Sequence, residues 1–255
     1  MNVQDISVGQ YELVMYVFSF CVSAFAAASL FFWFGRSQVS KHYKTAMTIT
    51  GLVTFIAFYN YWRLYDSWVA TYHIVNGALA ATGVPFDNIY RDSDWLLTVP
   101  LLLIELILVM RLPRSETVSR SWTLGVAAAL MIVLGIPGGV SDGVNSTRLI
   151  FGVLSMIPFL YIVYSLYAGL GESIERQPDS ARGLVRLARN LTVVTWFFYP
   201  IVYFLPFVLP MSGGTPTTVV QVGYAIADIT AKVVFGLLIY QIAVRKSEAE
   251  EGRNA

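Results

Sequence analysis

Long apolar stretches separated by short polar segments make up most of this chain. Seven of them are long enough to cross a bilayer as a helix, which takes about 20 residues. They cover residues 10–34, 44–68, 92–111, 121–141, 148–170, 184–209 and 217–244. Because the connections are short, we expect neighbouring helices to pack antiparallel. The pattern predicts an all-α membrane protein, a seven-transmembrane-helix bundle in which residues 1–246 form a single domain and residues 247–255 a disordered cytoplasmic tail.

Basic residues fall unequally on the two sides of this bundle. One side holds most of them: Arg36, Lys41, Lys44, Arg111, Arg114, Arg120, Arg176, Arg182, Arg186, Arg189, Arg245, Lys246 and Arg253. The other side has little more than Arg63, Arg91 and Arg148. Since basic loops stay in the cytoplasm, we expect the N-terminus outside and the C-terminus in the cytoplasm. Turn chemistry at Asn76 and Gly77 also predicts a small outer hairpin after the second span.

Composition agrees with a membrane protein and argues against several other classes. With 56% hydrophobic and 13% charged residues, the 255-residue chain is too apolar for a soluble domain of its size. Its basic residues form no stripe with interleaved aromatics, so no nucleic-acid partner is expected. One cysteine, Cys21, cannot form an intrachain disulfide, and two histidines at span ends leave no metal site. The N-terminal segment lacks basic residues, so no cleavable signal peptide is expected.

The seventh span carries an aspartate and a lysine, Asp228 and Lys232, one helical turn apart. A lysine near the middle of a membrane helix costs about 2.5–3.5 kcal/mol, so a sequence that keeps one there usually uses it. The spacing puts both side chains on one face, close enough to pair. One interpretation is a structural ion pair that holds two helices together. The other is a site for a Schiff base to an aldehyde ligand, because a desolvated lysine is nucleophilic and the carboxylate balances the resulting cation.

The third span holds two carboxylates at different depths. Asp94 and Thr98 are one turn apart, and Glu105 lies about 20° off the face of Asp94 and ~16 Å further along the axis. With the predicted orientation, Asp94 lies towards the outside and Glu105 towards the cytoplasm. In a purely structural interpretation, Arg91 and Asp94 are interfacial side chains and Glu105 is a packing carboxyl. A buried glutamate without a partner instead keeps its proton at neutral pH, which suits a proton donor.

Polar and aromatic residues also occur in the sixth and second spans. Trp196, Tyr199 and Tyr203 share one face of the sixth span. Such a stripe is more often plain packing than a ligand pocket. Pro200 kinks the helix there, either as a packing detail or as a hinge. In the second span, a Tyr-Asn-Tyr run centred on Asn60 places polar groups at membrane depth, where we expect hydrogen bonds between helices.

Three motifs on separate spans resemble those of the microbial (type 1) rhodopsins. Arg-x-x-Asp-Trp-x-x-Thr-x-Pro begins at Arg91, Trp-x-x-Tyr-Pro begins at Trp196, and Asp-x-x-x-Lys ends at Lys232. The resemblance covers essentially the whole chain. It points to the proteorhodopsin and xanthorhodopsin branch of bacterial proton pumps, whose third helix carries an Asp-Thr-Glu motif. It implies a light-driven outward proton pump with a central retinal pocket, a multi-pass protein of the bacterial inner (cytoplasmic) membrane and an ion transporter rather than an enzyme.

The resemblance implies roles for the charged residues. All-trans retinal would bind Lys232 as a protonated Schiff base, with Asp94 as primary counterion and proton acceptor. Asp228 would be the second counterion, and Glu105 would return a proton from the cytoplasmic side. The retinal pocket would be lined by Trp95, Met131, Gly135, Ser155, Phe159, Trp196, Tyr199 and Tyr203.

Three further positions take supporting roles by the same resemblance. Thr98 would hydrogen-bond near the proton acceptor, and Arg91 would gate the outer half-channel. Leu102 matches the position where green-absorbing members carry leucine and blue-absorbing members glutamine. Green absorption is therefore expected.

Two positions raise questions of their own. Asn60 stands where pumps of this branch usually have a histidine that pairs with the primary counterion. Because an amide takes neither a proton nor a positive charge, we expect other neighbours to set the titration of that counterion, and Asn60→His to move the pH of the colour change. Gly152 matches a glycine of carotenoid-binding members. It either opens a window for a carotenoid antenna or merely allows close helix packing.

Other functions are possible on the same scaffold. The runner-up is a sensory photoreceptor that signals to a partner, but such sensors often lack a carboxylic donor such as Glu105. Pumping of other ions is less expected, because sodium pumps carry an Asn-Asp-Gln motif in the third helix and chloride pumps lack the acidic counterion at the position of Asp94. An intramembrane enzyme with Lys232 as a catalytic amine needs a substrate opening and a further acid–base residue, and neither is evident. Besides the lipid bilayer and protons, the resemblance implies further copies of the chain as partners, in a homo-oligomer that is a pentamer or hexamer.

Overall fold

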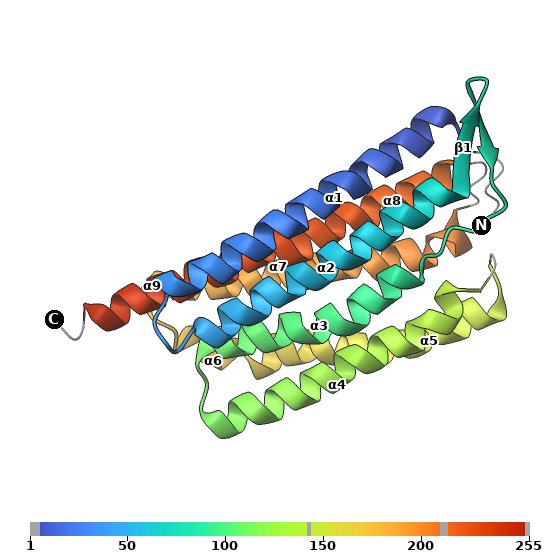
Figure 1. Cartoon of the computed structure of the whole chain (residues 1–255). Coiled ribbons are helices and arrows are strands. Elements are labelled where there is room, and N and C mark those ends of the chain that lie inside the picture. The colour runs from blue at the N-terminus through green and yellow to red at the C-terminus, as the bar shows by residue number, and fades with distance from the viewer. Residues whose placement is uncertain (1–5, 142–143, 210–213, 253–255) are drawn as a thin grey trace.

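Long helices lying side by side form the molecule, a computed structural model that describes residues 6–141, 144–209 and 214–252 (Figure 1). The long helices are α1 (Val8–Gly35), α2 (Lys44–Thr71), α3 (Ile89–Met110), α4 (Arg114–Gly139), α5 (Ser146–Tyr164) and α7 (Asp179–Val208). The last span consists of α8 (Thr215–Asp228), the π-helical segment η4 (Ile229–Val234) and α9 (Phe235–Glu251). Shorter elements are η2 (Arg36–Gln38), β1 (Tyr72–Val75), β2 (Ala78–Ala81), η3 (Ser165–Gly169) and α6 (Gly171–Glu175).

Consecutive helices are neighbours in the bundle. α1 packs along α2, α2 along α3, α3 along α4 and α4 along α5, while α7 packs on α9 and α8 on α1. Within the part of the chain that the structure describes, six helical segments are long and apolar enough to cross a membrane. The seventh span is α2, which is more polar because it carries Asn60, Arg63 and Asp66. Large apolar side chains cover the outer faces of the helices, which suits lipid contact. The prediction of a seven-helix membrane bundle is therefore confirmed.

Several helices extend beyond the predicted apolar limits. α4 begins at Arg114, seven residues before the predicted limit, and its first turns are held by an ion pair between Glu116 and Arg120, 2.7 Å apart. α9 continues to Glu251, where residues 247–255 were expected to be disordered. Ser247 Oγ accepts a hydrogen bond from the Ser40 backbone N–H at 2.8 Å, which ties this last turn to the α1–α2 connection. The prediction of a disordered tail was therefore wrong for residues 247–251, and residues 253–255 lie outside the described residues.

The predicted hairpin is confirmed between α2 and α3. β1 and β2 pair antiparallel, with Tyr72 opposite Ala81 and Val75 opposite Ala78. Both turn residues, Asn76 and Gly77, have positive φ, at 52° and 79°, as the tight primed turns of hairpins require. The hairpin lies at the end of the bundle where α1 begins, and α9 ends at the opposite end (Figure 1).

Buried charges stand out inside the apolar bundle. The main core joins α3, α5, α7 and α9, and a second cluster of aromatic residues fills the space between α1 and α2 at the hairpin end. Among the described residues, five acidic or basic side chains are at most 1% exposed: Arg91, Asp94, Glu105, Asp228 and Lys232. All five come from α3 or from the last span, so these two elements position the candidate site.

Candidate functional site: a buried lysine between two aspartates

Lys232 lies in the middle of the bundle with its amine between two carboxylates. Its Nζ is 2.8 Å from Asp94 Oδ2 and 2.7 Å from Asp228 Oδ1. The backbone around it is the π-helical segment η4, a local widening of the helix that often occurs at functional sites. The predicted pair of Asp228 and Lys232 is therefore present, and Asp94 from α3 joins it.

Asp228 is the more strongly hydrogen-bonded of the two aspartates. Besides Lys232, its Oδ1 accepts hydrogen bonds from Trp95 Nε1 at 3.0 Å and from the Tyr199 hydroxyl at 2.8 Å. Its Oδ2 accepts from the Tyr61 hydroxyl at 2.7 Å and lies 3.5 Å from Arg91 Nη1. Donors from four helical spans thus converge on one carboxylate. They favour its ionised form, because protonation would weaken these charge-assisted interactions.

Asp94 has far fewer partners. Asp94 contacts the cluster through its ion pair with Lys232. Neither of its carboxyl oxygens has a well-formed hydrogen bond among the described residues. Thr98 was expected to hydrogen-bond near this carboxylate, but its Oγ1 donates to the main-chain oxygen of Asp94 at 2.8 Å. A carboxylate in contact with the amine and otherwise without hydrogen bonds is well placed to take a proton from it.

Arg91 lies on the side of the cluster that faces the hairpin. It is fully buried, and it donates from Nη1 to the Tyr61 hydroxyl at 3.1 Å and from Nη2 to Gln221 Oε1 at 2.7 Å. Its Nε donates to Asn88 Oδ1 at 3.4 Å. The site thus contains two cations and two anions, which is how charges are accommodated in a low-dielectric bundle. The side chain lies between the lysine and the hairpin end, where an outer gate was predicted.

Glu105 lies apart from this network, nearer the opposite end of α3. It is fully buried, and neither carboxyl oxygen has a well-formed hydrogen bond among the described residues, although Thr50 of α2 lies beside it. Its α3 neighbours include Leu102 and Leu106, which belong to the main apolar core. The structure therefore places two separate carboxyls on α3, one at the amine and one in apolar packing.

Two of the predicted pocket residues, Trp95 and Tyr199, donate hydrogen bonds to Asp228, and several others lie in or against the main core. Trp95 and Tyr199 meet edge to face, with ring centroids 4.9 Å apart. Phe159 and Trp196 are buried in the main core, and Leu102, Trp95, Met131 and Tyr199 belong to or pack against the same core. Ser155 Oγ donates to the main-chain oxygen of Met131 at 2.8 Å, and a Cβ on Gly135 would lie 3.6 Å from that hydroxyl.

Tyr203 has partners of a different kind. Its hydroxyl donates to the Arg148 main-chain oxygen at 3.0 Å, and Arg148 Nη2 donates to the Tyr203 main-chain oxygen at the same distance. A Cβ on Gly152 would meet the Tyr203 ring at 2.5 Å and the Phe204 ring at 2.7 Å. These rings fill the space beside Gly152, so this glycine allows close packing of α5 against α7.

Two further polar residues belong to the site: Tyr61, from the Tyr-Asn-Tyr run that was expected to form hydrogen bonds between helices, and Gln221, which was not singled out from the sequence. Asn60, which was not expected to set the titration of the primary counterion, donates from Nδ2 to the Ile56 main-chain oxygen within α2 at 3.0 Å. Its neighbour Tyr61 reaches Asp228 instead. Gln221, which holds Arg91, is seven residues before Asp228 and therefore on the same helix face. The sequence spacing could therefore have predicted Gln221 as part of the site. Whether Asn60 or Tyr61 hydrogen-bonds to Asp228 depends instead on the rotation of α2.

A seven-helix membrane bundle with a buried lysine, two aspartates and an arginine at its centre defines the class of the protein. A family model described as bacteriorhodopsin-like protein matches residues 12–246. The chain is 31% identical over 229 residues to the green-light absorbing proteorhodopsin of Gamma-proteobacterium EBAC31A08, with 88% of this chain and 84% of the relative covered. It is 31% identical over 213 residues to bacteriorhodopsin of Halobacterium salinarum, with 81% and 74% covered.

Solved structures agree with this assignment. The structure of xanthorhodopsin, described as a light-driven ion pump with dual chromophore, superposes with a TM-score of 0.92 at 46% identity, covering 96% of this chain and 98% of that one. A thermophilic rhodopsin superposes with a TM-score of 0.91 at 40% identity, with the same coverage. The chain belongs to the bacteriorhodopsin-like family, the microbial (type 1) rhodopsins.

Proposed function

We propose that the protein is a light-driven outward proton pump that binds all-trans retinal covalently at Lys232. The observation that carries the proposal is the placement of two carboxyls on α3. Asp94 touches the Lys232 amine at 2.8 Å, whereas Glu105 is buried nearer the other end of the helix. The similarity to a proteorhodopsin and to xanthorhodopsin, a light-driven ion pump, supports the same function.

The residues present fit a retinal group. The Lys232 nitrogen is buried between two carboxylates that balance a cation, and the rings of Trp95, Trp196 and Tyr199 belong to the surrounding core. When bound, retinal supplies the absorption of light and a light-driven change of shape next to this nitrogen. Leu102, buried among the same core residues, supports absorption in the green by the resemblance noted above.

The two aspartates would have different roles, one as proton acceptor and one as permanent counterion. Asp94 accepts the proton from the Lys232 nitrogen, because it is in contact with that nitrogen and gives up few other interactions on protonation. Asp228 stays ionised, because four further side chains donate to it or lie close to it. Arg91 then stabilises the remaining negative charge and stands between the acceptor and the outside.

Glu105 would restore the proton from the cytoplasmic side. A carboxyl buried without a charged partner is stable in its protonated form and can give its proton to the Lys232 nitrogen once that nitrogen is neutral. Transport has a direction because acceptor and donor lie on opposite sides of the nitrogen.

Acidification of the medium tests the proposal. Retinal-supplied cells in weak buffer are illuminated with green light, with a protonophore and a Lys232→Ala variant as controls. We expect the medium to acidify in the unmodified protein and not in either control, and the absorption maximum to lie in the green. A coloured protein that leaves the pH unchanged would contradict the pump and favour a sensory photoreceptor.

A further inference from the structure

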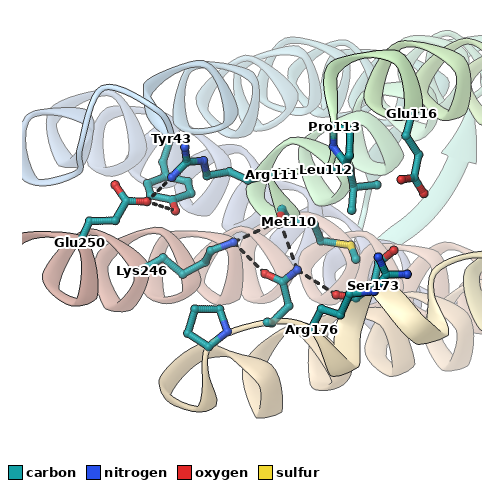
Figure 2. Close-up of a pocket in the computed structure, with 12 residues that line it drawn as sticks. Tyr43, Met110, Arg111, Leu112, Pro113, Glu116, Ser173, Arg176, Lys246 and Glu250 are labelled. Atoms are coloured by element: carbon teal, nitrogen blue, oxygen red, sulfur yellow. Dashed lines mark hydrogen bonds and ion pairs between the residues drawn. The ribbon is translucent and has the colours of Figure 1, made fainter. Parts of the chain in front are cut away.

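A second group of polar side chains lies at the opposite end of the bundle from the hairpin. There, a cavity of about 330 Å³ opens between the end of α3, the end of α9 and the α5–α7 connection. Figure 2 shows its lining, which includes Met110, Arg111, Glu116, Lys246 and Glu250. With the predicted orientation, this cavity faces the cytoplasm. It is the side from which a proton for Glu105 has to come.

Lys246 of α9 is buried in the wall of this cavity. It is 5% exposed, and its Nζ donates to the main-chain oxygens of Val109 at 2.8 Å and Met110 at 3.3 Å and to Gln177 Oε1 at 2.7 Å. All three ammonium hydrogens thus have an acceptor. The Tyr43 ring lies 5.5 Å from Nζ, and no carboxylate among the described residues forms an ion pair with it.

Gln177 completes the connection between three elements. It follows α6, and its Nε2 donates to the main-chain oxygens of Met110 at 3.2 Å and Ser173 at 2.9 Å. The free carbonyls at the end of α3 are therefore capped by side chains from α9 and from the α6–α7 connection (Figure 2). We call Lys246, Gln177 and the carbonyls of Val109 and Met110 the clasp.

The rim of the cavity carries carboxylates. Glu250 accepts hydrogen bonds from the Tyr43 hydroxyl at 2.7 Å and from Ser40 Oγ at 3.1 Å, and it pairs with Arg111. Burial raises the pKa of the Tyr43 hydroxyl to about 12, with the bond to Glu250 adding to the effect, so this hydroxyl remains a donor. Glu116, paired with Arg120, also lines the cavity.

The clasp lies close to Glu105 along α3. Met110 is five residues beyond Glu105, which is about 7.5 Å along the helix axis. We propose that the cavity is the cytoplasmic inlet for protons and that the clasp is the closed gate between it and Glu105. The proposal rests on the proposed function, in which Glu105 is reprotonated from this side.

Charge and geometry both suit Lys246 for this task. The ammonium group of Lys246 repels a proton that approaches along the cavity wall, so the closed clasp opposes uptake. Its hydrogen bonds join α9 to α3 and to the connection that leads into α7, so movement of any one of these elements breaks them. Lys246 and Gln177 act on the proton path through position and charge, as positioning residues.

Flash spectroscopy of the retinal-loaded protein tests the gate. Two rates are measured: loss of the proton from the Lys232 nitrogen and its return, which depends on Glu105. Lys246→Met and Gln177→Leu are each expected to speed the return by about fivefold or more, because each removes hydrogen bonds that hold the clasp closed. The loss rate and the absorption maximum are expected to stay unchanged. A purely structural role would not separate the two rates.

Matched variants and a second readout separate the possible outcomes. Arg245→Gln removes a neighbouring charge, 56% exposed and paired with Glu248, and is expected to leave the return rate unchanged. Lys246→Arg, which keeps the charge and donors, is expected to stay close to the unmodified rate. Return rates within about twofold in both clasp variants, or parallel changes in both steps, would overturn the gate. Failure of the unmodified protein to acidify the medium, with its cycle complete, would instead overturn the proposed function.

Discussion

The two halves of α3 lie in opposite surroundings, although they belong to one helix. At the half nearer the hairpin, which the predicted orientation places outside, Asp94 adjoins a network in which Lys232, Arg91 and Asp228 compensate one another's charge. Tyr61 and Gln221 supply further hydrogen bonds there. At the other half, which the predicted orientation places on the cytoplasmic side, Glu105 is fully buried beside Thr50, and its α3 neighbours Leu102 and Leu106 belong to the main apolar core.

This difference indicates how each half would handle a proton. In the outer half, a chain of hydrogen-bonded groups leads from Lys232 past Asp228 and Arg91 towards the hairpin end, so a proton released there has polar groups along its way. In the cytoplasmic half, no comparable chain of hydrogen-bonded groups reaches the Glu105 carboxyl among the described residues. Under the proposed function, reprotonation of Glu105 would therefore require the bundle to open on that side, and the clasp at the end of α3 is where this opening would start.

The largest effect is expected from removing the acceptor. Asp94→Asn removes the carboxylate that contacts the Lys232 nitrogen and has no other well-formed hydrogen bond. We therefore expect light-driven acidification to fall by about a hundredfold or more, which is the scale of a lost acid–base group. The matched control is Asp92→Asn, two residues earlier on α3 and only half-buried, which should keep most of the activity. Pumping is measured as the initial rate of pH change under light. Comparable loss in both variants would show that the acceptor was misassigned.

A smaller effect is expected on the cytoplasmic side. Glu105→Gln keeps the shape of the side chain but removes its proton, so the return of the proton to Lys232 should slow by about tenfold or more, while its loss stays fast. A permeant weak acid should restore part of the rate, because it can replace the missing donor. Glu172→Gln, 87% exposed and paired with Arg176, is the control. An unchanged return rate in Glu105→Gln would refute the donor role.

The fold could be predicted from the sequence because lipid imposes a simple rule on it. Apolar stretches of sufficient length had to become helices, and the turn at Asn76 and Gly77 had to become a hairpin. The ends of helices were less predictable, because the apolar stretch ends at the membrane surface whereas the helix can continue into water. α9 runs on to Glu251 because hydrogen bonds from Ser40 and Tyr43 hold its last turn.

The site was predictable where spacing on one helix decides it, and less so where helix rotation does. Asp228 and Lys232 share a face at any rotation, and so does Gln221, which the same reasoning would have included. The contribution of α2 depended on which of two adjacent buried residues hydrogen-bonds to Asp228, and in the structure this is Tyr61, whereas Asn60 donates within its own helix. The clasp could not be foreseen, because Gln177 and Lys246 meet only through the tertiary fold.

The role of α2 leads to a third prediction, on the pH at which the colour changes. Tyr61→Phe removes a hydrogen bond to Asp228 and a contact of Arg91, so this pH should move by about one unit, since a lost bond to a charged group is worth about 1.5–3 kcal/mol. Asn60→Ala removes only an amide bonded within its own helix and should leave it nearly unchanged. Asn60→His, which adds a titratable ring, is expected to move it measurably. The measurement is an absorption titration, and a larger shift in Asn60→Ala than in Tyr61→Phe would contradict the geometry.

The smallest effect concerns Gly152 of α5, which contacts the rings of α7 and none of the charged groups named above. If its role is close packing, Gly152→Ala forces the rings of Tyr203 and Phe204 aside and should cost about 1–3 kcal/mol, seen as a melting temperature several degrees lower. Gly139→Ala is the control, because a Cβ there meets nothing within 4 Å. The alternative, a carotenoid antenna, requires the same rings to move aside for a ligand. A carotenoid band in the excitation spectrum of the unmodified protein, absent in Gly152→Trp, would show that the glycine serves as a window, since packing alone transfers no energy.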